Sequence, residues 1–247
     1  MRIALIGYGK MGQEIARAAA DAGIEVGAIF TSRNNASGQG LTADALREID
    51  VCLDFSTPQT VFTHLRALAQ VGKPVVVGTT GWYDRLDEAR QVVEHAGIGC
   101  VYAPNFSIGV NLFYRLIAQA CRLFSPYPDF DPYVVEYHHR AKADYPSGTA
   151  LRLADILLEN LTAKARAVTR LSGRLADEEI HVASVRGGAE PGRHVVGFDA
   201  PYETIEIVHS VRQRRAFAMG ALLAARWIRT RRGFYRFDDL LEESLSL

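Results

Sequence analysis

Two adjacent histidines and a lysine near the middle of the chain have the side chains needed to transfer protons and bind anions. Residues 136–150 read EYHHRAKADYPSGTA, so Lys142 follows His139 by three positions. An imidazole gains or loses a proton near neutral pH, and a lysine adds a positive charge. One histidine can therefore act as a general acid while its neighbour holds the substrate. Together these residues suit a small carboxylate.

The end of this stretch is typical of the start of a helix. Pro146 is followed by Ser147, Gly148 and Thr149, and then by apolar residues at helical spacing. A serine or threonine caps free backbone N–H groups, and a glycine lets a ligand approach the backbone closely. The unpaired N–H groups and partial positive charge of a helix start attract an anion.

The strand-forming residues Tyr133, Val134 and Val135 lead directly into His138 and His139. Adjacent side chains in an extended segment point to opposite faces. The two imidazoles can therefore share one role only if the strand ends between them. Taken singly, a histidine or lysine here is also compatible with a solvated strand end followed by an ordinary capped helix.

As a whole, E-x-H-H-x-x-K-x-D-x-P-S-G-T-A resembles the signature of the dihydrodipicolinate reductase (4-hydroxy-tetrahydrodipicolinate reductase) family, whose members act in the diaminopimelate route to lysine. Every specified position matches between Glu136 and Ala150. The resemblance implies that His138 donates or accepts the proton, with Lys142 as a second acid and charge partner. It also implies a substrate-binding group consisting of His139, Ser147, Gly148 and Thr149.

The resemblance further implies NAD(P)H-dependent reduction of 4-hydroxy-tetrahydrodipicolinate, a cyclic imine with two carboxylates, to tetrahydrodipicolinate. Family members usually form homotetramers. Three alternatives stay open: a related imine or amino-acid dehydrogenase of the diaminopentanoate type, a non-catalytic dinucleotide-binding protein, and a structural scaffold. The last two leave the HHxxK string unexplained. Arg214 is a further basic candidate for the site.

The N-terminus carries the pattern expected of a dinucleotide site. An apolar run at residues 2–6 predicts a buried strand, GYGKMG follows it, and a helical pattern continues to Gly23. In strand–GxGxxG–helix, the first glycine permits a tight turn, the second lets the pyrophosphate approach, and the third allows close packing. The predicted first cofactor loop is Gly7, Tyr8, Gly9, Lys10, Met11 and Gly12. Many family members have a loop one residue longer.

The second predicted strand, residues 25–30, is followed by Thr31, Ser32 and Arg33 rather than by an acidic residue. NAD-selective sites usually place an Asp or Glu there to bind the ribose hydroxyls. A hydroxyl and a guanidinium instead suit the 2′-phosphate of NADP. We therefore predict that Ser32 and Arg33 bind the cofactor, which is NADPH or NADH with a slight preference for NADPH.

Strands and helices alternate from residue 1 to about residue 106, which predicts a doubly wound parallel sheet of the Rossmann type. Ligands of such sheets bind beyond the C-terminal ends of the strands. Two further loops at such ends, GTTG and APNFS, resemble the family's second and third cofactor loops, which reach the nicotinamide half. The residues implied to line the cofactor there are Gly78, Thr79, Thr80, Ala103, Pro104, Asn105 and Phe106.

After Ser107 the alternation stops, and three strand-like runs follow at 180–185, 194–198 and 204–209. Residues 163–179 read as a surface connection. This part resembles the family's second α+β domain, an open, mostly antiparallel sheet with a few helices. The predicted domains are 1–106 with 217–247 for the dinucleotide, and 107–216 for substrate binding and oligomerisation.

Composition adds few constraints. Lysine plus arginine equals aspartate plus glutamate at 28 each, which predicts neither a nucleic-acid nor a membrane partner. The three cysteines are widely spaced, and two of them lie in apolar runs, so we expect buried thiols rather than bridges or metal ligands. No metal is expected. No signal peptide or membrane-spanning run is recognised, which predicts a cytoplasmic location.

Overall fold

The computed structural model describes residues 1–245 and divides the chain into two compact units. The first unit is Met1–Ile108 together with the segment from Arg214 onward, and the second is Gly109–Gln213. Residues 246 and 247, which end the predicted dinucleotide domain, lie outside the described residues.

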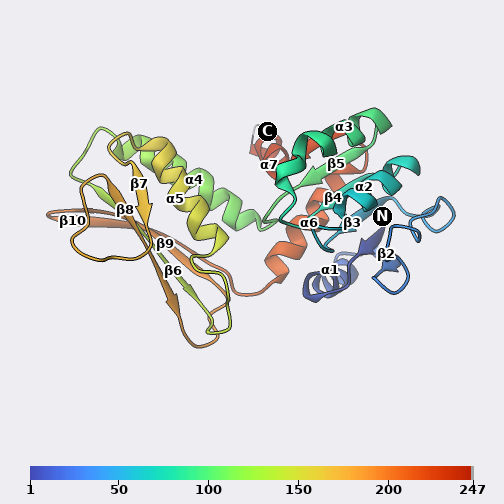
Figure 1. Cartoon of the computed structure of the whole chain (residues 1–247), viewed down its shortest axis with the longest axis horizontal. Coiled ribbons are helices and arrows are strands. Elements are labelled where there is room, and N and C mark those ends of the chain that lie inside the picture. Colours follow the sequence, from blue (N-terminus) through green and yellow to red (C-terminus); the bar gives the residue numbers. More distant parts are fainter. Residues whose placement is uncertain (246–247) are drawn as a thin grey trace. The chain divides into compact units, whose positions relative to one another are not determined.

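The first unit contains a six-stranded sheet in which every pairing is parallel, in the order β11-β5-β4-β3-β1-β2 (Figure 1). Its strands are β1 (Arg2–Ile6), β2 (Glu25–Phe30), β3 (Val51–Asp54), β4 (Val75–Val77), β5 (Gly99–Tyr102) and β11 (Gly233–Arg236). The predicted Rossmann-type sheet is confirmed. The sixth strand, β11, comes from the C-terminal tail and was not predicted.

Helices cover both faces of this sheet because its strands are apolar on both sides. On one face, Ile3 and Leu5 of β1 pack into a core formed with α1 (Lys10–Asp21), α6 (Arg215–Ile228) and α7 (Phe237–Leu245). On the other, Ala4 and Ile6 pack into a core formed with α2 (Val61–Gln70) and α3 (Leu86–Ala96). A 3₁₀ turn, η1 (Tyr83–Arg85), precedes α3.

The second unit has a five-stranded sheet in the order β10-β9-β6-β8-β7. Its strands are β6 (Asp131–His138), β7 (Arg166–Val168), β8 (Glu179–Arg186), β9 (Arg193–Ala200) and β10 (Glu203–Ser210). One face packs against α4 (Ile108–Phe124) and α5 (Gly148–Asn160). The α+β class is confirmed.

The second sheet is mixed rather than mostly antiparallel. The pairings of β9 with β6 and β10 are antiparallel, but β6–β8 and β8–β7 are parallel. The reason is the crossover: α5 connects β6 to β7 and β8, and a helical crossover returns the chain in the same direction. The short strand β7 lies within the segment predicted to be a surface connection, so that prediction was wrong for Arg166–Val168.

Cys52, Cys100 and Cys121 are all buried and free, as the sequence predicted. Burial raises the pKa of the Cys52 thiol to about 12, so it stays protonated at neutral pH. Within the described residues, no helix has both the length and the apolar character needed to cross a membrane.

Candidate active site

The signature stretch begins on β6, where polar side chains replace apolar ones on the face that packs against the helices. Val134, Glu136 and His138 are the buried members of an alternating series. β6 ends at His138, so His139 lies outside the strand and is only partly buried. The strand therefore ends between the two histidines, which is the condition under which they can share a site.

The carboxylate of Glu136 joins three parts of the second unit. Its Oε1 accepts hydrogen bonds from Nη2 of Arg186 at 2.7 Å and from the backbone N–H of Ser147 at 3.0 Å. Its Oε2 lies against Nδ1 of His138. Burial raises the pKa of Glu136, but hydrogen bonds, led by the one from Arg186, lower it to about 2. Glu136 is thus a buried, charged centre that links β6, β8 and the start of α5.

His138 has only 8% of its surface exposed, and burial lowers the pKa of its imidazole despite the opposing effect of Glu136. Because Nδ1 faces the carboxylate, Nε2 is the nitrogen left for proton transfer. A Cβ at Gly192 would lie 3.0 Å from that Nε2, so the glycine keeps a side chain away from it. The ring of His194 stands edge-on to the His138 ring, with centroids 5.2 Å apart.

Ser147 is the N-cap of α5. Its hydroxyl accepts a hydrogen bond from the backbone N–H of Ala150 at 3.2 Å and lies 3.2 Å from Nε2 of His194. Ser147 is itself buried, and its backbone N–H donates to Glu136. The predicted helix start is therefore present, but the Ser147 side chain is already bound within the protein.

Three further predicted site residues are each only partly buried: His139, Lys142 and Thr149. Nζ of Lys142 lies 2.7 and 2.8 Å from the two carboxylate oxygens of Asp144. Partial burial raises the pKa of the Asp144 carboxyl. Hydrogen bonds, led by the one from Lys142, have the larger combined effect, so the pKa lies below its ordinary value. The side chain of Thr149 forms a hydrogen bond with Tyr114 of α4. Gly148, the first residue of α5, is exposed.

Glu136, His138 and His194 place three potential metal-ligand atoms within 4.8 Å of one another. A cation there would meet the guanidinium of Arg186, which already neutralises Glu136. Burial lowers the pKa of His194 to about 4, and the neighbouring His138 adds to the effect. We therefore interpret the cluster as a proton-transfer and positioning group rather than as a metal centre.

The buried His194 leads to a prediction about acid stability. Unfolded histidine binds a proton below about pH 6.5, whereas folded His194 does so only below about pH 4. Between these values the unfolded chain binds more protons, so the free energy of unfolding falls as the pH drops. Urea unfolding of the wild-type protein should show that His194 lowers the free energy of unfolding by up to about 3 kcal/mol as the pH falls from about 6.5 to about 4.

His194→Gln should flatten that pH dependence. It should not abolish it, because burial also lowers the pKa values of His138 and His209. His95→Gln, at an exposed position of α3, serves as the control and should keep the wild-type slope. An unchanged slope in His194→Gln would contradict the assignment of a buried, neutral imidazole.

In the first unit, the glycine loop has the geometry that a pyrophosphate requires. Gly7 has φ of +91°, and a Cβ there would lie 2.3 Å from the carbonyl oxygen of Phe55. A Cβ at Gly12 would lie 2.3 Å from the carbonyl of Gly7, so only glycine lets α1 pack this closely. Gly9 is the N-cap of α1 without a side-chain cap, and its Cβ position is open. The loop therefore fits a dinucleotide phosphate at the helix start.

The other predicted cofactor residues also follow the C-terminal ends of parallel strands. Ser32 and Arg33 lie in an exposed turn after β2. In the loop after β4, Thr79 is buried and Thr80 is exposed. In the loop after β5, Ala103 and Phe106 are buried, Asn105 is partly buried and Pro104 is exposed. In the first loop Tyr8 and Lys10 are exposed and Met11 is partly buried.

Phe55, directly after β3, contacts three of these loops. Its carbonyl faces Gly7, and a Cβ at Gly78 would lie 2.1 Å from its ring. The ring centroids of Phe55 and Phe106 are 6.0 Å apart. The glycine loop, the GTTG loop and the APNF loop are therefore brought together at one edge of the sheet by a residue that the sequence analysis did not select.

Arg186 and His194 were also not selected as site residues. Their signal was present in the strand pattern: Arg186 is in phase with the buried Ile180 and Val182 of β8, and His194 with the buried Val196 of β9. A polar residue in phase with core positions requires a buried partner. The exposed Arg214 is the N-cap of α6 in the first unit.

Comparison with known proteins extends over the whole chain. The family model "Dihydrodipicolinate reductase, N-terminus" matches residues 1–106, and "Dihydrodipicolinate reductase, C-terminus" matches residues 109–241. A 4-hydroxy-tetrahydrodipicolinate reductase from Christiangramia forsetii is 34% identical, with 98% of each chain covered. One from Archaeoglobus fulgidus is also 34% identical over 98% of this chain and 100% of its own length.

Solved structures support the same fold. A dipicolinate-bound dihydrodipicolinate reductase from Paenisporosarcina sp. TG-14 has a TM-score of 0.77 at 24% identity, with 97% of this chain and 98% of that chain covered. A Corynebacterium glutamicum DAP dehydrogenase in complex with DAP has a TM-score of 0.55 at 13% identity, covering 96% and 92%. With both family models matched and full-length relatives above 30% identity, the chain belongs to the dihydrodipicolinate reductase family.

Proposed function

We propose that the chain catalyses the NAD(P)H-dependent reduction of 4-hydroxy-tetrahydrodipicolinate to tetrahydrodipicolinate in the diaminopimelate route to lysine. The observation that carries this proposal is the complete signature from Glu136 to Ala150, which occurs together with the glycine loop after β1. Full-length relatives bear the name of this activity. Rossmann geometry alone would suit many dehydrogenases, whereas the signature is particular to this family.

In this reaction one reduced nicotinamide and one proton are consumed, and one water is released for each substrate reduced. NAD(P)H, when bound in the glycine-loop site, supplies the hydride. His138 transfers the proton through Nε2, because Nδ1 is held by Glu136. Lys142 contributes a positive charge and acts as a second acid beside His138. Substrate and product both keep the ring imine and differ by a hydroxyl replaced with hydrogen, so the proton from this pair balances the hydroxyl that leaves as water.

The two substrate carboxylates require separate donors. His139 binds one of them, since it lies just beyond the end of β6 and is accessible. The first-turn N–H groups of α5 at Gly148 and Thr149 bind the other, aided by the positive end of the helix. Ser147 contributes by capping that helix, because its hydroxyl is already bound to Ala150 and His194.

The test is an absorbance assay at the reduced-nicotinamide band, with the substrate generated in situ by the preceding synthase reaction. Purified protein should oxidise NADPH or NADH only when the synthase product is present. No oxidation with either cofactor, in protein that binds them, would favour a related dehydrogenase acting on another imine. Loss of nucleotide binding altogether would contradict the reductase function itself.

We further propose a slight preference for NADPH, based on Ser32 and Arg33 in the exposed turn after β2. Arg33→Ala should raise the KM for NADPH by about tenfold, the equivalent of one charge-assisted hydrogen bond, and leave the KM for NADH unchanged. Steady-state kinetics with both cofactors measure this. Arg47→Ala is the control, since Arg47 is exposed and paired with Asp44. Equal changes for both cofactors would contradict a role at the 2′-phosphate.

We also propose a homotetramer assembled through the face of the second sheet that α4 and α5 do not cover. Val185 of β8 and Val208 of β10 are each 44% exposed on that face, and Val208 is in register with Val195 of β9, which pairs with Val135 of β6. Val208→Asp should convert tetramers to smaller species in analytical ultracentrifugation, because a buried unpaired charge opposes association. Asp129→Asn, at a loop position, is the control. A wild-type monomer would contradict this proposal.

The proposed site of action is the cytoplasm. The three free, buried thiols are compatible with a reducing compartment. Localisation of a tagged chain by fractionation tests the assignment.

A further inference from the structure

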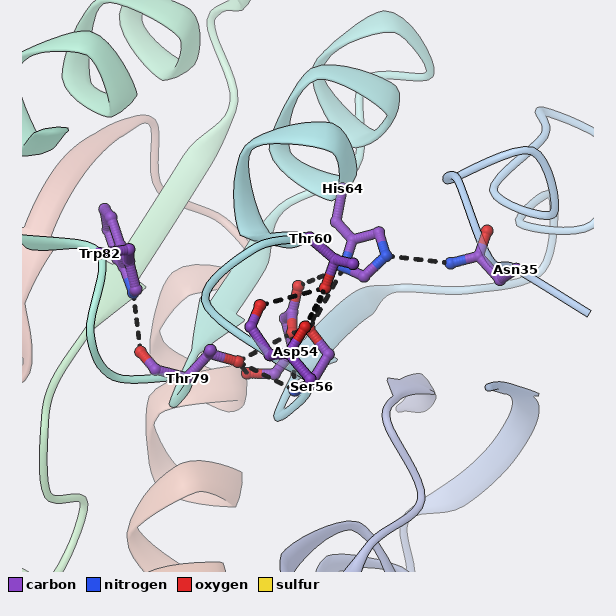
Figure 2. A network of polar contacts seen from close by, with 8 residues as sticks. Asn35, Asp54, Ser56, Thr60, His64, Thr79 and Trp82 are labelled. Carbon is purple, nitrogen blue, oxygen red and sulfur yellow. Dashed lines mark hydrogen bonds and ion pairs between the residues drawn. The ribbon is translucent and has the colours of Figure 1, made fainter. Parts of the chain in front are cut away.

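A buried polar network lies at the C-terminal end of β3 in the first unit, among the proposed cofactor loops (Figure 2). Asp54, the last residue of β3, is only 1% exposed. Its Oδ2 lies 2.8 Å from Nδ1 of His64 on α2. Its Oδ1 accepts hydrogen bonds from the backbone N–H and hydroxyl of Ser56, at 3.0 and 2.5 Å, and from the Thr79 hydroxyl at 3.1 Å. Asp54 is thus a buried carboxylate with four donors.

One arm of the network runs toward the turn that carries Ser32 and Arg33. Nε2 of His64 lies 3.3 Å from Nδ2 of the buried Asn35, whose Oδ1 accepts from the N–H of Gly40 at 2.9 Å. Since that oxygen is an acceptor, the amide nitrogen faces His64 and donates to it. The hydrogen bonds therefore run in one direction, from Gly40 through Asn35 and His64 to the carboxylate.

Asn35 also closes the turn itself. Its backbone N–H donates to the carbonyl of Thr31 at 2.8 Å, and Ser32, Arg33 and Asn34 are the residues between them. Asn35 thereby helps to fix the turn that presents Arg33, together with Asn34, whose Oδ1 accepts from the Thr31 N–H at 2.7 Å. The side-chain amide of Asn35 is in turn held by its hydrogen bond to Nε2 of His64.

The other arm runs into the GTTG loop. The Thr79 hydroxyl bonds to Asp54 and accepts from the Ser56 N–H at 2.9 Å, and the Thr79 carbonyl accepts from Nε1 of Trp82 at 2.7 Å. The backbone N–H of Gly78 donates to the Asp54 carbonyl at 2.8 Å. The loop proposed to contact the nicotinamide half of the cofactor is therefore held by the same residue, through the Asp54 carboxylate and the Asp54 backbone carbonyl.

This network does not have the arrangement of a hydrolytic triad. In a triad, the serine and the carboxylate lie at opposite nitrogens of the imidazole. Here the Ser56 hydroxyl and Asp54 both approach Nδ1 of His64, at 3.4 and 2.8 Å. The Ser56 hydroxyl donates to the carboxylate directly rather than to the imidazole. The arrangement therefore serves to position loops.

We propose that His64, paired with Asp54, is a positioning residue that coordinates the two ends of the dinucleotide site. Through Asn35 it fixes the turn that presents Arg33 to the adenosine 2′-phosphate, and through Asp54 it fixes Thr79 in the loop at the nicotinamide end. The inference rests on the proposed NAD(P)H-dependent function. It adds a residue outside all the cofactor loops that sets both nucleotide affinity and the discrimination between NADPH and NADH.

Two substitutions at one position separate the two arms. In His64→Asn, the shorter amide can still donate to Asp54 from the place of Nδ1 but no longer reaches Asn35. In His64→Gln, the longer amide can accept from Asn35 at the place of Nε2 but leaves Asp54 without that donor. Fluorescence titration of the enzyme with NADPH and with NADH, in the absence of substrate, gives both dissociation constants for each variant.

We expect His64→Asn to weaken NADPH binding by about five- to tenfold, as loss of one hydrogen bond does, with little change for NADH. We expect His64→Gln to weaken binding of both nucleotides by similar factors. Leu68→Ala, a buried apolar truncation on the same helix, controls for general destabilisation, and melting temperatures are compared for all variants.

The inference is overturned if the two His64 variants bind both nucleotides as wild type does. It is equally overturned if their NADPH-to-NADH affinity ratios both match that of Leu68→Ala, because the network would then be merely structural. Failure of the proposed function has a different signature: wild-type protein would bind neither nucleotide, or would bind them without oxidising them when the synthase product is present.

Discussion

Replacing His138 with glutamine should lower kcat by about 10²–10⁴-fold, the usual contribution of a positioned proton-transfer group. Glutamine retains a hydrogen-bonding side chain of similar reach but cannot accept and release a proton at neutral pH. KM should change little, because the carboxylate-binding groups are elsewhere. Steady-state kinetics over a range of substrate concentrations separate the two constants.

His139→Gln is the matched control, as it makes the same chemical change one residue away. His139 is outside β6 and is proposed to bind a carboxylate, so its replacement should raise KM more than it lowers kcat. Near-normal turnover of His138→Gln would remove His138 from the proton-transfer role. So would the opposite pattern, in which His138→Gln mainly raises KM and His139→Gln mainly lowers kcat.

Replacing Glu136 with alanine should lower the free energy of unfolding by about 3–5 kcal/mol, the usual cost of removing one partner from a buried ion pair. The guanidinium of Arg186 would lose its carboxylate, and the Ser147 N–H would lose its acceptor. Activity should fall as well, because Nδ1 of His138 would no longer be held by an acceptor. Urea unfolding and kinetics on the same preparation measure both effects.

A double variant separates stability from catalysis at this position. Glu136→Met combined with Arg186→Met replaces the pair with apolar side chains of similar volume, which is often neutral or stabilising. It should recover most of the lost stability without recovering activity. Recovery of both would mean that Glu136 has no positioning role toward His138, and recovery of neither would indicate that the Ser147 contact dominates.

The proposed cofactor loops were predictable because they depend on local patterns. Gly7, Gly9 and Gly12 follow an apolar strand directly, and the backbone geometry that they permit is required wherever helix, strand and phosphate meet. The same holds for the helix start at Ser147, whose capping side chain acts within three residues. Such features need no knowledge of strand order.

Features that depend on long-range pairing could not be predicted in the same way. Arg186 and His194 approach His138 only because β8 and β9 flank β6, and strand order is not contained in the alternation of apolar residues. The mixed character of the second sheet and the assignment of β11 have the same cause. His64 is one of the buried residues of α2, and its role depends on Asp54 and Asn35, which reach it from other parts of the chain.

The pairing of β11 with β5 has a consequence for how the protein is made. Gly233–Arg236 completes the sheet that begins with Arg2, yet the whole second unit is translated between them. Domains fold as units during synthesis. Gly109–Gln213 can therefore finish folding on the ribosome before the last strand of the first unit has been synthesised. We therefore expect the sheet of Gly109–Gln213 to form during synthesis before β11 can join the sheet of the first unit.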